Sequence, residues 1–221
     1  MLVEGVEKGI TSKAGLIAHG RGEAFDYILG EETIETALEA EKAAVDELLN
    51  AENPVISING NVAALVPEDI VKLSERLDTK LEVNLFHRTE ERLKRIKDTL
   101  VENGAEKVYG LEADAKIPNL DHDRALCSKE GIYSSDVVLV PLEDGDRTKA
   151  LSDMGKTIIT IDLNPMSRTA KTADITIVDN ITRAVKNMID IEPSEDEFDN
   201  KKNLSNTLRY MSERLINLSE M

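Results

Sequence analysis

The run Val137–Val138–Leu139–Val140 decides the fold, because it is apolar throughout and stops at Pro141 before a polar stretch. Two similar runs follow it, Thr157–Ile161 and Ile175–Val178, and each is again followed by polar residues. Strand-length runs without polar alternation are typical of strands that helices cover on both faces, as in parallel sheets. We therefore predict an α/β fold, a Rossmann-like parallel sheet flanked by helices.

Polar side chains follow all three of these runs. They are the segments Glu143–Arg147, Asp162–Asn164 with Ser167–Thr169, and Asp179–Asn180. In open parallel sheets, ligands bind outside the carboxyl ends of the strands. The sequence therefore predicts that Asp, Asn, Ser and Arg side chains gather along one edge of the sheet and form a ligand site there.

The remaining segments are expected to support that edge. Further strands are predicted at 54–58, 81–86 and 107–110, and helices at 2–10, 33–50 (with Thr33 as N-cap), 67–77, 89–103 and 181–191. His19–Glu23 is interpreted as a polar turn, and 111–131 as a long loop or flap, a length that is uncommon unless functional. We expect three parts: a single α/β domain at 1–191, an acidic linker at 192–203, and a C-terminal amphipathic helix at 204–221.

Composition limits the function. The net charge of −16 argues against nucleic acid or an anionic membrane as partner, since both need a basic face. Cys127 is the only cysteine, so the chain has neither a disulfide framework nor a cysteine metal site. No apolar run approaches membrane-spanning length. We expect a cytoplasmic protein that binds small molecules and neither nucleic acid nor membranes.

Two glycine-containing segments suit an anionic ligand. Gly20 and Gly22 flank Arg21, so the backbone can approach a ligand while a cation points at it; an ordinary glycine turn with a surface arginine is an equal alternative. Asn59–Gly60–Asn61 follows the first strand and can present backbone N–H groups to an anion, although a tight Asn-Gly turn is common.

Other basic and polar residues carry weaker signals. Arg88 lies at a strand-to-helix turn and suits phosphate, whereas Arg92 and Arg95 are interpreted as solvated helix charges. His122 and Cys127 lack the partner pattern of a metal site or a nucleophile.

Several strings together resemble one family, the archaeal phosphopantothenate synthetases, that is 4-phosphopantoate:β-alanine ligases. The strings are Ala18–Tyr27, Ser57–Asn61, Glu82–Phe86 with Arg88–Arg92, Pro141–Arg147, and Asp162–Pro165 with Ser167–Ala170. The match runs from about Val3 to Asn180. The resemblance implies a homodimeric ligase of coenzyme A biosynthesis that joins 4-phosphopantoate to β-alanine using ATP, with release of AMP and diphosphate.

The resemblance also implies which residues bind the nucleotide. They are Arg21, Asp162, Leu163, Asn164, Pro165, Arg168, Thr169, Ala170, Asn180 and Ile181. Family members begin further upstream, in a segment with another ATP-contacting arginine, and this chain starts after it. That departure keeps open an alternative function, a non-catalytic nucleotide-binding or sensing protein on the same scaffold.

The residue chemistry is compatible with AMP release through an acyl adenylate, which needs charge neutralisation and positioning more than a protein nucleophile. We expect Arg21, Arg88, Arg147 and Arg168 around the phosphates. Glu143 or Asp146 is a candidate for Mg²⁺ bound with ATP; the alternative for Glu143–Arg147 is an acidic helix N-terminus with internal pairing.

Two further roles are assigned to residues of the chain. His19, His87 and Asp146 are the candidates for accepting the proton of the β-alanine amine. We predict that Asn59, Gly60, Asn61 and Asn84 contact substrate.

Overall fold

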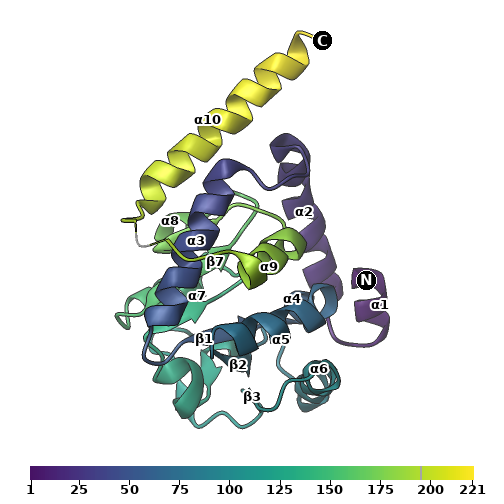
Figure 1. Ribbon diagram of the computed structural model, residues 1–221. Coiled ribbons are helices and arrows are strands. Elements are labelled where there is room, and N and C mark those ends of the chain that lie inside the picture. The colour runs from purple at the N-terminus through teal and green to yellow at the C-terminus, as the bar shows by residue number, and fades with distance from the viewer. Residues whose placement is uncertain (195) are drawn as a thin grey trace.

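The computed structural model describes residues 1–194 and 196–221, and its centre is a six-stranded sheet (Figure 1). The strand order is β3-β2-β1-β6-β7-β8, and every neighbouring pair is parallel. The strands are β1 (Val55–Ile58), β2 (Lys80–Val83), β3 (Val108–Tyr109), β6 (Val137–Leu139), β7 (Thr157–Ile161) and β8 (Ile175–Ile177). The predicted parallel α/β sheet is confirmed.

Helices cover both faces of this sheet. They are α1 (Leu2–Glu7), α2 (Lys13–Leu29), α3 (Glu35–Asn50), α4 (Gly60–Leu65), α5 (Pro67–Arg76), α6 (Glu90–Glu102), α7 (Gly145–Ser152), α8 (Arg168–Thr172), α9 (Ile181–Asp190) and α10 (Asn200–Ser219). Helices α3, α5 and α9 pack together on one face (Figure 1). Across the described residues, no helix is both long and apolar enough to cross a membrane.

The strand side chains divide between two cores, as a doubly covered sheet requires. Leu139 and Ile159 belong to the larger core beneath α3, α5 and α9. Val138, Val140 and Ile158 belong to a smaller core with α7 and residues 117–132. All of these side chains are fully buried, which explains why the strand sequences show no polar alternation.

Polar caps at the carboxyl edge start the helices that follow the strands. Asn59 Oδ1 accepts from the backbone of α4, and Asp144 Oδ1 accepts the Arg147 N–H at 2.9 Å in α7. Ser167 and Asn180 cap α8 and α9 in the same way. Because capping satisfies backbone donors that the helix leaves free, these residues also fix the loops that form the edge.

The predicted polar turn at His19–Glu23 is wrong, because α2 runs through it without a break. Ser12 caps α2, with its Oγ 3.1 Å from the Gly15 nitrogen, and the helix ends only at Gly30, whose φ of +100° favours glycine. A helical glycine costs about 1 kcal/mol relative to alanine. The cap and the tertiary contacts of α2 offset that cost.

Two predicted helix starts also differ from the structure. Helix α3 begins at Glu35 with Ile34 as N-cap, and the Thr33 hydroxyl donates instead to Asp179 Oδ2 at 2.6 Å. Helix α10 begins at Asn200, capped by Asp199, so the last residues of the predicted 192–203 linker are helical. Residue 195 of that linker lies outside the described residues.

Residues 111–131, here called the β4–β5 segment, are mostly irregular, as expected. They contain a short antiparallel pair, β4 (Ala115–Lys116) with β5 (Leu126–Cys127). Buried Glu82 of β2 holds the end of the segment, because its two carboxylate oxygens accept from Ser128 N at 2.9 Å and Ile132 N at 2.7 Å. The segment is therefore fastened to the sheet by a strand carboxylate.

Candidate active site

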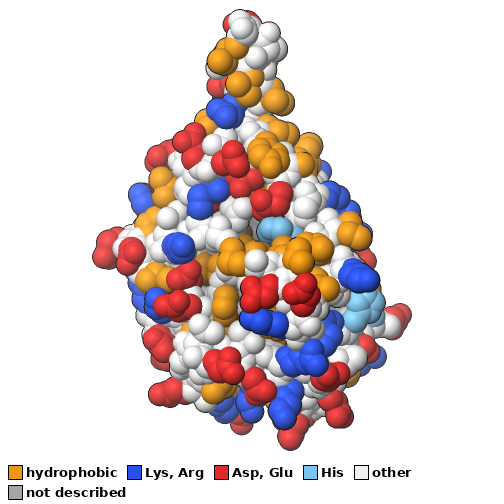
Figure 2. Space-filling view, turned by 90° about the vertical axis from the view of Figure 1, so that its right-hand side faces the viewer, with side chains coloured by type: hydrophobic (Ala, Val, Ile, Leu, Met, Phe, Trp, Pro, Cys, Tyr) orange, Lys and Arg blue, Asp and Glu red, His pale blue; other side chains and the backbone are white. Residues whose placement is uncertain are grey.

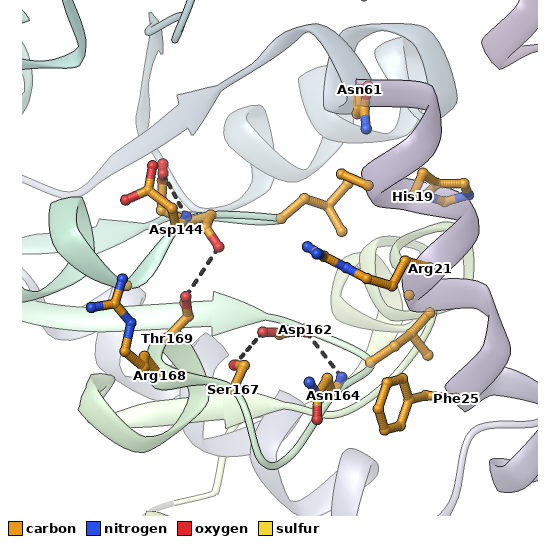
Figure 3. Close-up of a pocket in the computed structure, with 16 residues that line it drawn as sticks. His19, Arg21, Phe25, Asn61, Asp144, Asp162, Asn164, Ser167, Arg168 and Thr169 are labelled. Carbon is orange, nitrogen blue, oxygen red and sulfur yellow. Dashed lines mark hydrogen bonds between the residues drawn. The ribbon is translucent and has the colours of Figure 1, made fainter. Parts of the chain in front are cut away.

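Two adjoining cavities form one cleft at the carboxyl edge of the sheet. The first, about 360 Å³, lies between α2 and the loops that follow β6 and β7 (Figure 3). The second, about 340 Å³, lies between α2, the start of α4 and the loop that follows β2. Both are lined by Ala18, Arg21, Asn61, Leu142, Glu143 and Asp144. Two ligands bound in this cleft would meet at that common wall.

In the first cavity, a cation without a protein partner in the described residues faces a half-buried carboxylate. Arg21 points from α2 into the cavity (Figure 3), and no hydrogen bond or ion pair to its guanidinium occurs in the described part of the chain. Asp162 accepts from Asn164 N at 2.9 Å and from the Ser167 hydroxyl at 2.5 Å. Burial raises the pKa of Asp162, against the lowering effects of these bonds and of Arg21.

The far side of the first cavity is formed by the start of α8. Arg168 Nη2 lies 3.0 Å from Asp146 Oδ1, and both side chains are largely exposed, at 74% and 67%. The Thr169 hydroxyl donates to the Glu143 carbonyl at 3.0 Å, which joins α8 to the loop after β6 (Figure 3). Arg168 is thus an exposed cation at the rim of the cavity, with a weak surface partner.

Beneath the common wall lies a charge cluster in which the side chains of Arg124, Glu143 and Arg147 are buried and that of Asp144 is partly exposed. The Glu143 carboxylate is 2% exposed and pairs with both arginines, with Arg147 Nη1 at 2.5 Å. Arg124 also pairs with Asp144, and Arg147 Nη1 donates to the Ser57 hydroxyl at 3.1 Å. Burial would raise the pKa of Asp144, but Arg124 and the Arg147 N–H outweigh it and lower that pKa.

The second cavity gathers cations and aromatic rings. Arg92 donates to the carbonyls of His87 at 2.6 Å and Ile10 at 3.2 Å. The Nε atoms of Arg92 and Arg124 are buried and have no hydrogen-bond partner within the described residues. Phe86 lies edge-on to His87, with ring centroids 4.9 Å apart. With Arg21, this cavity presents three guanidinium groups to an anionic ligand.

Comparison with known proteins places the chain. The family model for phosphopantothenate/pantothenate synthetase matches residues 36–218. The chain belongs to this family. A 4-phosphopantoate–beta-alanine ligase of Thermococcus onnurineus is 53% identical over 99% of this chain and 89% of its own length.

Two further relatives carry the same name. The protein of Thermococcus kodakarensis is 52% identical over 99% of this chain and 89% of its own length. That of Methanosarcina mazei is 54% identical over 96% of this chain and 88% of its own length. These names do not favour the non-catalytic alternative.

In this member of the family, more than half of the predicted site residues line the cleft. They are His19, Arg21, Asn59, Gly60, Asn61, His87, Glu143, Asp162, Leu163, Asn164, Arg168 and Thr169. The others lie outside the lining of both cavities: Asn84, Arg88, Asp146, Arg147, Pro165, Ala170, Asn180 and Ile181. For both groups, contact with a ligand stays a prediction.

Several residues of the second group have partners within the protein. Arg88 donates to the carbonyls of Gly110 at 2.6 Å and Leu111 at 3.0 Å, and the Asn84 amide donates to two carbonyls of the β4–β5 segment. Arg147 is fully buried and pairs with Glu143, which is the internal pairing weighed for Glu143–Arg147. These side chains support the cleft from behind its surface.

Sequence reasoning missed Arg124 and treated Arg92 as a solvated charge. Arg124 lies in the β4–β5 segment, where no strong periodicity placed it near the sheet edge. The signal that was available was the length of that segment, since long irregular segments in compact domains are usually functional. Arg92 was harder to single out as a site residue, because Arg88 and Arg95 lie near it in sequence and are the same residue type.

Proposed function

We propose that this chain is an ATP-dependent ligase that joins 4-phosphopantoate to β-alanine and releases AMP and diphosphate. One observation carries the proposal: two cavities of similar size share a wall that holds Arg21. A reaction between ATP and a second anionic substrate needs such a meeting point. The ligase names of the relatives support the same activity.

We assign ATP to the first cavity and 4-phosphopantoate to the second. The first cavity is lined by most of the residues that the family resemblance implies for the nucleotide, among them Arg21, Asn164 and Thr169. The second offers Arg92 and Arg124, and guanidinium groups suit a phosphate monoester because they donate in a planar fork. This placement brings the substrate carboxylate toward the common wall.

The chemistry then proceeds in two displacements. A carboxylate oxygen of 4-phosphopantoate attacks the α-phosphorus of ATP, the bond to diphosphate breaks, and an acyl adenylate forms. The unprotonated amine of β-alanine attacks the acyl carbon and AMP leaves. Arg21 neutralises negative charge that develops at the α-phosphate. The side chains that line the two cavities hold the reactants in line.

For the amine proton, His19 is our choice among the three candidates. His19 and His87 line the cleft, whereas Asp146 faces solvent beside Arg168. His19 Nε2 lies 3.0 Å from Glu23 Oε1, so this carboxylate fixes the orientation of the imidazole ring in the cleft. After each turnover, the imidazolium returns its proton to solvent.

The residues present do not fit a protein-held Mg²⁺. Both oxygens of Glu143 already face arginines, and within the described residues no three His, Cys, Asp or Glu side chains gather to hold a metal. Asp146 faces solvent beside Arg168 and lies outside the cavity lining. If Mg²⁺ takes part, it comes with the phosphates of ATP and not through Glu143, and we derive no step from it.

The proposal is tested by product analysis. Purified protein with ATP, Mg²⁺, 4-phosphopantoate and β-alanine should yield AMP in amounts equal to 4′-phosphopantothenate, and omission of any substrate should abolish this. Exchange of labelled diphosphate into ATP should require 4-phosphopantoate but not β-alanine, because the adenylate forms first. ATP binding without AMP formation under the complete conditions would contradict the proposal.

The outer half of α10 suggests the homodimer that the resemblance implies. The apolar stripe of α10 begins with Leu204 and Met211, which are buried against α2 and α3. The same stripe continues into Leu215 and Leu218, which are about half exposed where the helix projects beyond the body (Figures 1 and 2). An exposed apolar stripe at heptad spacing is typical of a helix that packs against another apolar surface. We assign that surface to α10 of a second copy of this chain.

Sedimentation tests this assignment. The wild type should sediment as a dimer at micromolar concentration, and L215S/L218S should shift toward monomer while its circular dichroism stays unchanged. E213Q, in the same turn of α10 but off the stripe, is the control and should remain dimeric. A monomeric wild type would overturn the assignment.

A further inference from the structure

Helix α2 forms one long side of the cleft, yet the turn around Arg21 has little packing of its own. At Gly20 and Gly22 no heavy atom lies within 4 Å of where a Cβ would stand. Arg21 itself is exposed and Ala18 is exposed as well. The place of Arg21 in the cleft therefore depends on how the next turn of α2 is held.

That next turn is held by Asp26, whose side chain is 7% exposed. Arg183 of α9 donates to both of its oxygens, through Nη2 to Oδ1 at 2.6 Å and Nη1 to Oδ2 at 3.2 Å. The Asn180 amide adds a third bond to Oδ2 at 2.9 Å. A two-pronged arginine–carboxylate pair fixes orientation as well as distance, so it restrains the rotation of α2.

The same arginine is tied to the sheet. Arg183 Nε and Nη2 donate to Asp179 Oδ1 at 2.9 and 2.5 Å, and Asp179 is fully buried just after β8. In the described structure, no other lysine or arginine pairs with Asp26 or Asp179. Without Arg183, two buried carboxylates would face each other without a cation, which disfavours close contact of α2 with the sheet edge.

A second route leads from this pair into the cleft. The Asn180 amide also donates to Glu23 Oε1 at 2.9 Å, and the same oxygen lies 3.0 Å from His19 Nε2. His19 lines the first cavity, whereas Arg183 lines neither cavity. Arg183 thus acts on the cleft only through other residues.

We propose that Arg183 is a positioning residue for the ligase reaction. By pairing with Asp26 and Asp179 it fixes α2 on the sheet edge and so sets where Arg21 stands. The inference rests on the proposed function, because Arg21 is assigned there to ATP. Loss of Arg183 should therefore weaken the use of ATP through Arg21, and should have no effect on ATP once Arg21 is gone.

A double-mutant cycle tests this dependence. We expect R183Q to raise the KM for ATP about tenfold, and R183K, which keeps the charge without the fork, to give a smaller rise. In the R21A background, adding R183Q should leave the KM for ATP within about twofold of R21A alone. Thermal stability should fall by the same amount in both backgrounds, because a purely structural loss is independent of Arg21.

Arg76→Gln is the matched control. Arg76 of α5 ties the other end of α9 by donating to the carbonyls of Met188 and Ile191, but α2 is not part of that tie. R76Q should lower thermal stability and leave the KM for ATP within about twofold of wild type. Equal KM increases in R76Q and R183Q would overturn the inference, as would additive effects of R21A and R183Q.

Failure of the two proposals is distinguishable. Wild type that forms no AMP overturns the ligase, and the same variants are then compared by calorimetric titration with ATP. Active wild type with an unchanged KM for ATP in folded R183Q overturns the positioning role alone. If R183Q does not fold, R183K gives the result, and an unchanged KM for ATP there overturns the role.

Discussion

Two parts of the cleft use arginine in opposite ways. One is helix α2, here called the wall, and the other is the charge cluster of Arg124, Glu143, Asp144 and Arg147, here called the floor. On the wall, Arg21 is exposed and has no partner within the described residues. On the floor, Arg147 is fully buried and its charge is balanced by Glu143. The difference shows that an exposed arginine without a partner is free to bind a ligand, while a fully buried, charge-balanced arginine supports the site from behind.

The largest expected effect is on the floor. Glu143→Gln leaves Arg124 and Arg147 buried with only Asp144 as a charged partner, and breaking a buried pair costs about 3–5 kcal/mol. We expect a loss of that size in the free energy of unfolding, measured by urea denaturation. The control is E68Q, which removes the exposed i,i+4 partner of Lys72 and should change stability by less than about 0.5 kcal/mol. Equal losses in the free energy of unfolding for E143Q and E68Q would show that the buried ion pairs of the floor contribute no more than an exposed pair.

The next effect is on the wall. Arg21→Ala should raise the KM for ATP roughly 10- to 100-fold, since a hydrogen bond to a charged group contributes about 1.5–3 kcal/mol. Its urea midpoint should match that of wild type, because Arg21 has no protein partner to lose. Steady-state kinetics and one denaturation curve check both parts. A loss above about 1 kcal/mol in the free energy of unfolding would show that Arg21 has a structural role in the protein.

A buried carboxyl without an arginine bond sharpens the comparison further. Burial, then the charge of Asp179, raise the pKa of Glu41 to about 8, and within the described residues its hydrogen-bond donor is the Asn187 amide. Because the folded-state pKa lies above the unfolded value of 4.5, the stabilisation is complete below pH 4.5 and is lost as pH rises through 8.

Unfolding measured from pH 6 to pH 9 tests this. Wild type should lose about 2–3 kcal/mol over that range relative to Glu41→Gln, which has no proton to release. E39Q, a change of an exposed glutamate on the same helix, should follow the wild-type curve. Parallel curves for E41Q and wild type would mean that Glu41 does not change its protonation state over this pH range.

The smallest effect belongs to the rim. Arg168→Ala should raise the KM for ATP about fivefold, because an exposed cation is screened and already shares Asp146. D146N frees Arg168 from that partner and should leave the KM for ATP unchanged or slightly lower. A larger effect of R168A than of R21A would reverse the assignment of the stronger phosphate contact.

The strands and the sheet edge could be predicted from sequence because their signals are local. Unbroken apolar runs such as Ile175–Val178 are sufficient to place strands, and a capping residue such as Thr89, whose hydroxyl accepts from Arg92 N, places a helix start. The same local rules mislead at His19–Glu23, where glycine content suggests a turn. Contacts of α2 with α4 and α10 override that propensity, and these contacts are invisible in the local sequence.

The site was harder to predict than the fold, because residue type does not reveal burial. Arg147 and Arg168 both follow strand ends and both suit phosphate, yet one is buried and the other is a rim residue. Arg124 lies 40 residues after Asn84 in sequence, yet its carbonyl accepts from the Asn84 amide, and Glu82 of the same strand end holds Ser128 and Ile132. Pairing at that separation has no short-range signature.

The two cavities differ in their dependence on the hydrogen bonds by which Glu82 holds the β4–β5 segment. The β4–β5 segment supplies Arg124 to the second cavity and contributes nothing to the lining of the first. Brief release of that segment would therefore take Arg124 away from the second cavity and remove no lining residue from the first. Amide hydrogen exchange should be faster at Ser128 than in β7, and the transiently open molecule would hold a nucleotide that has nothing to react with.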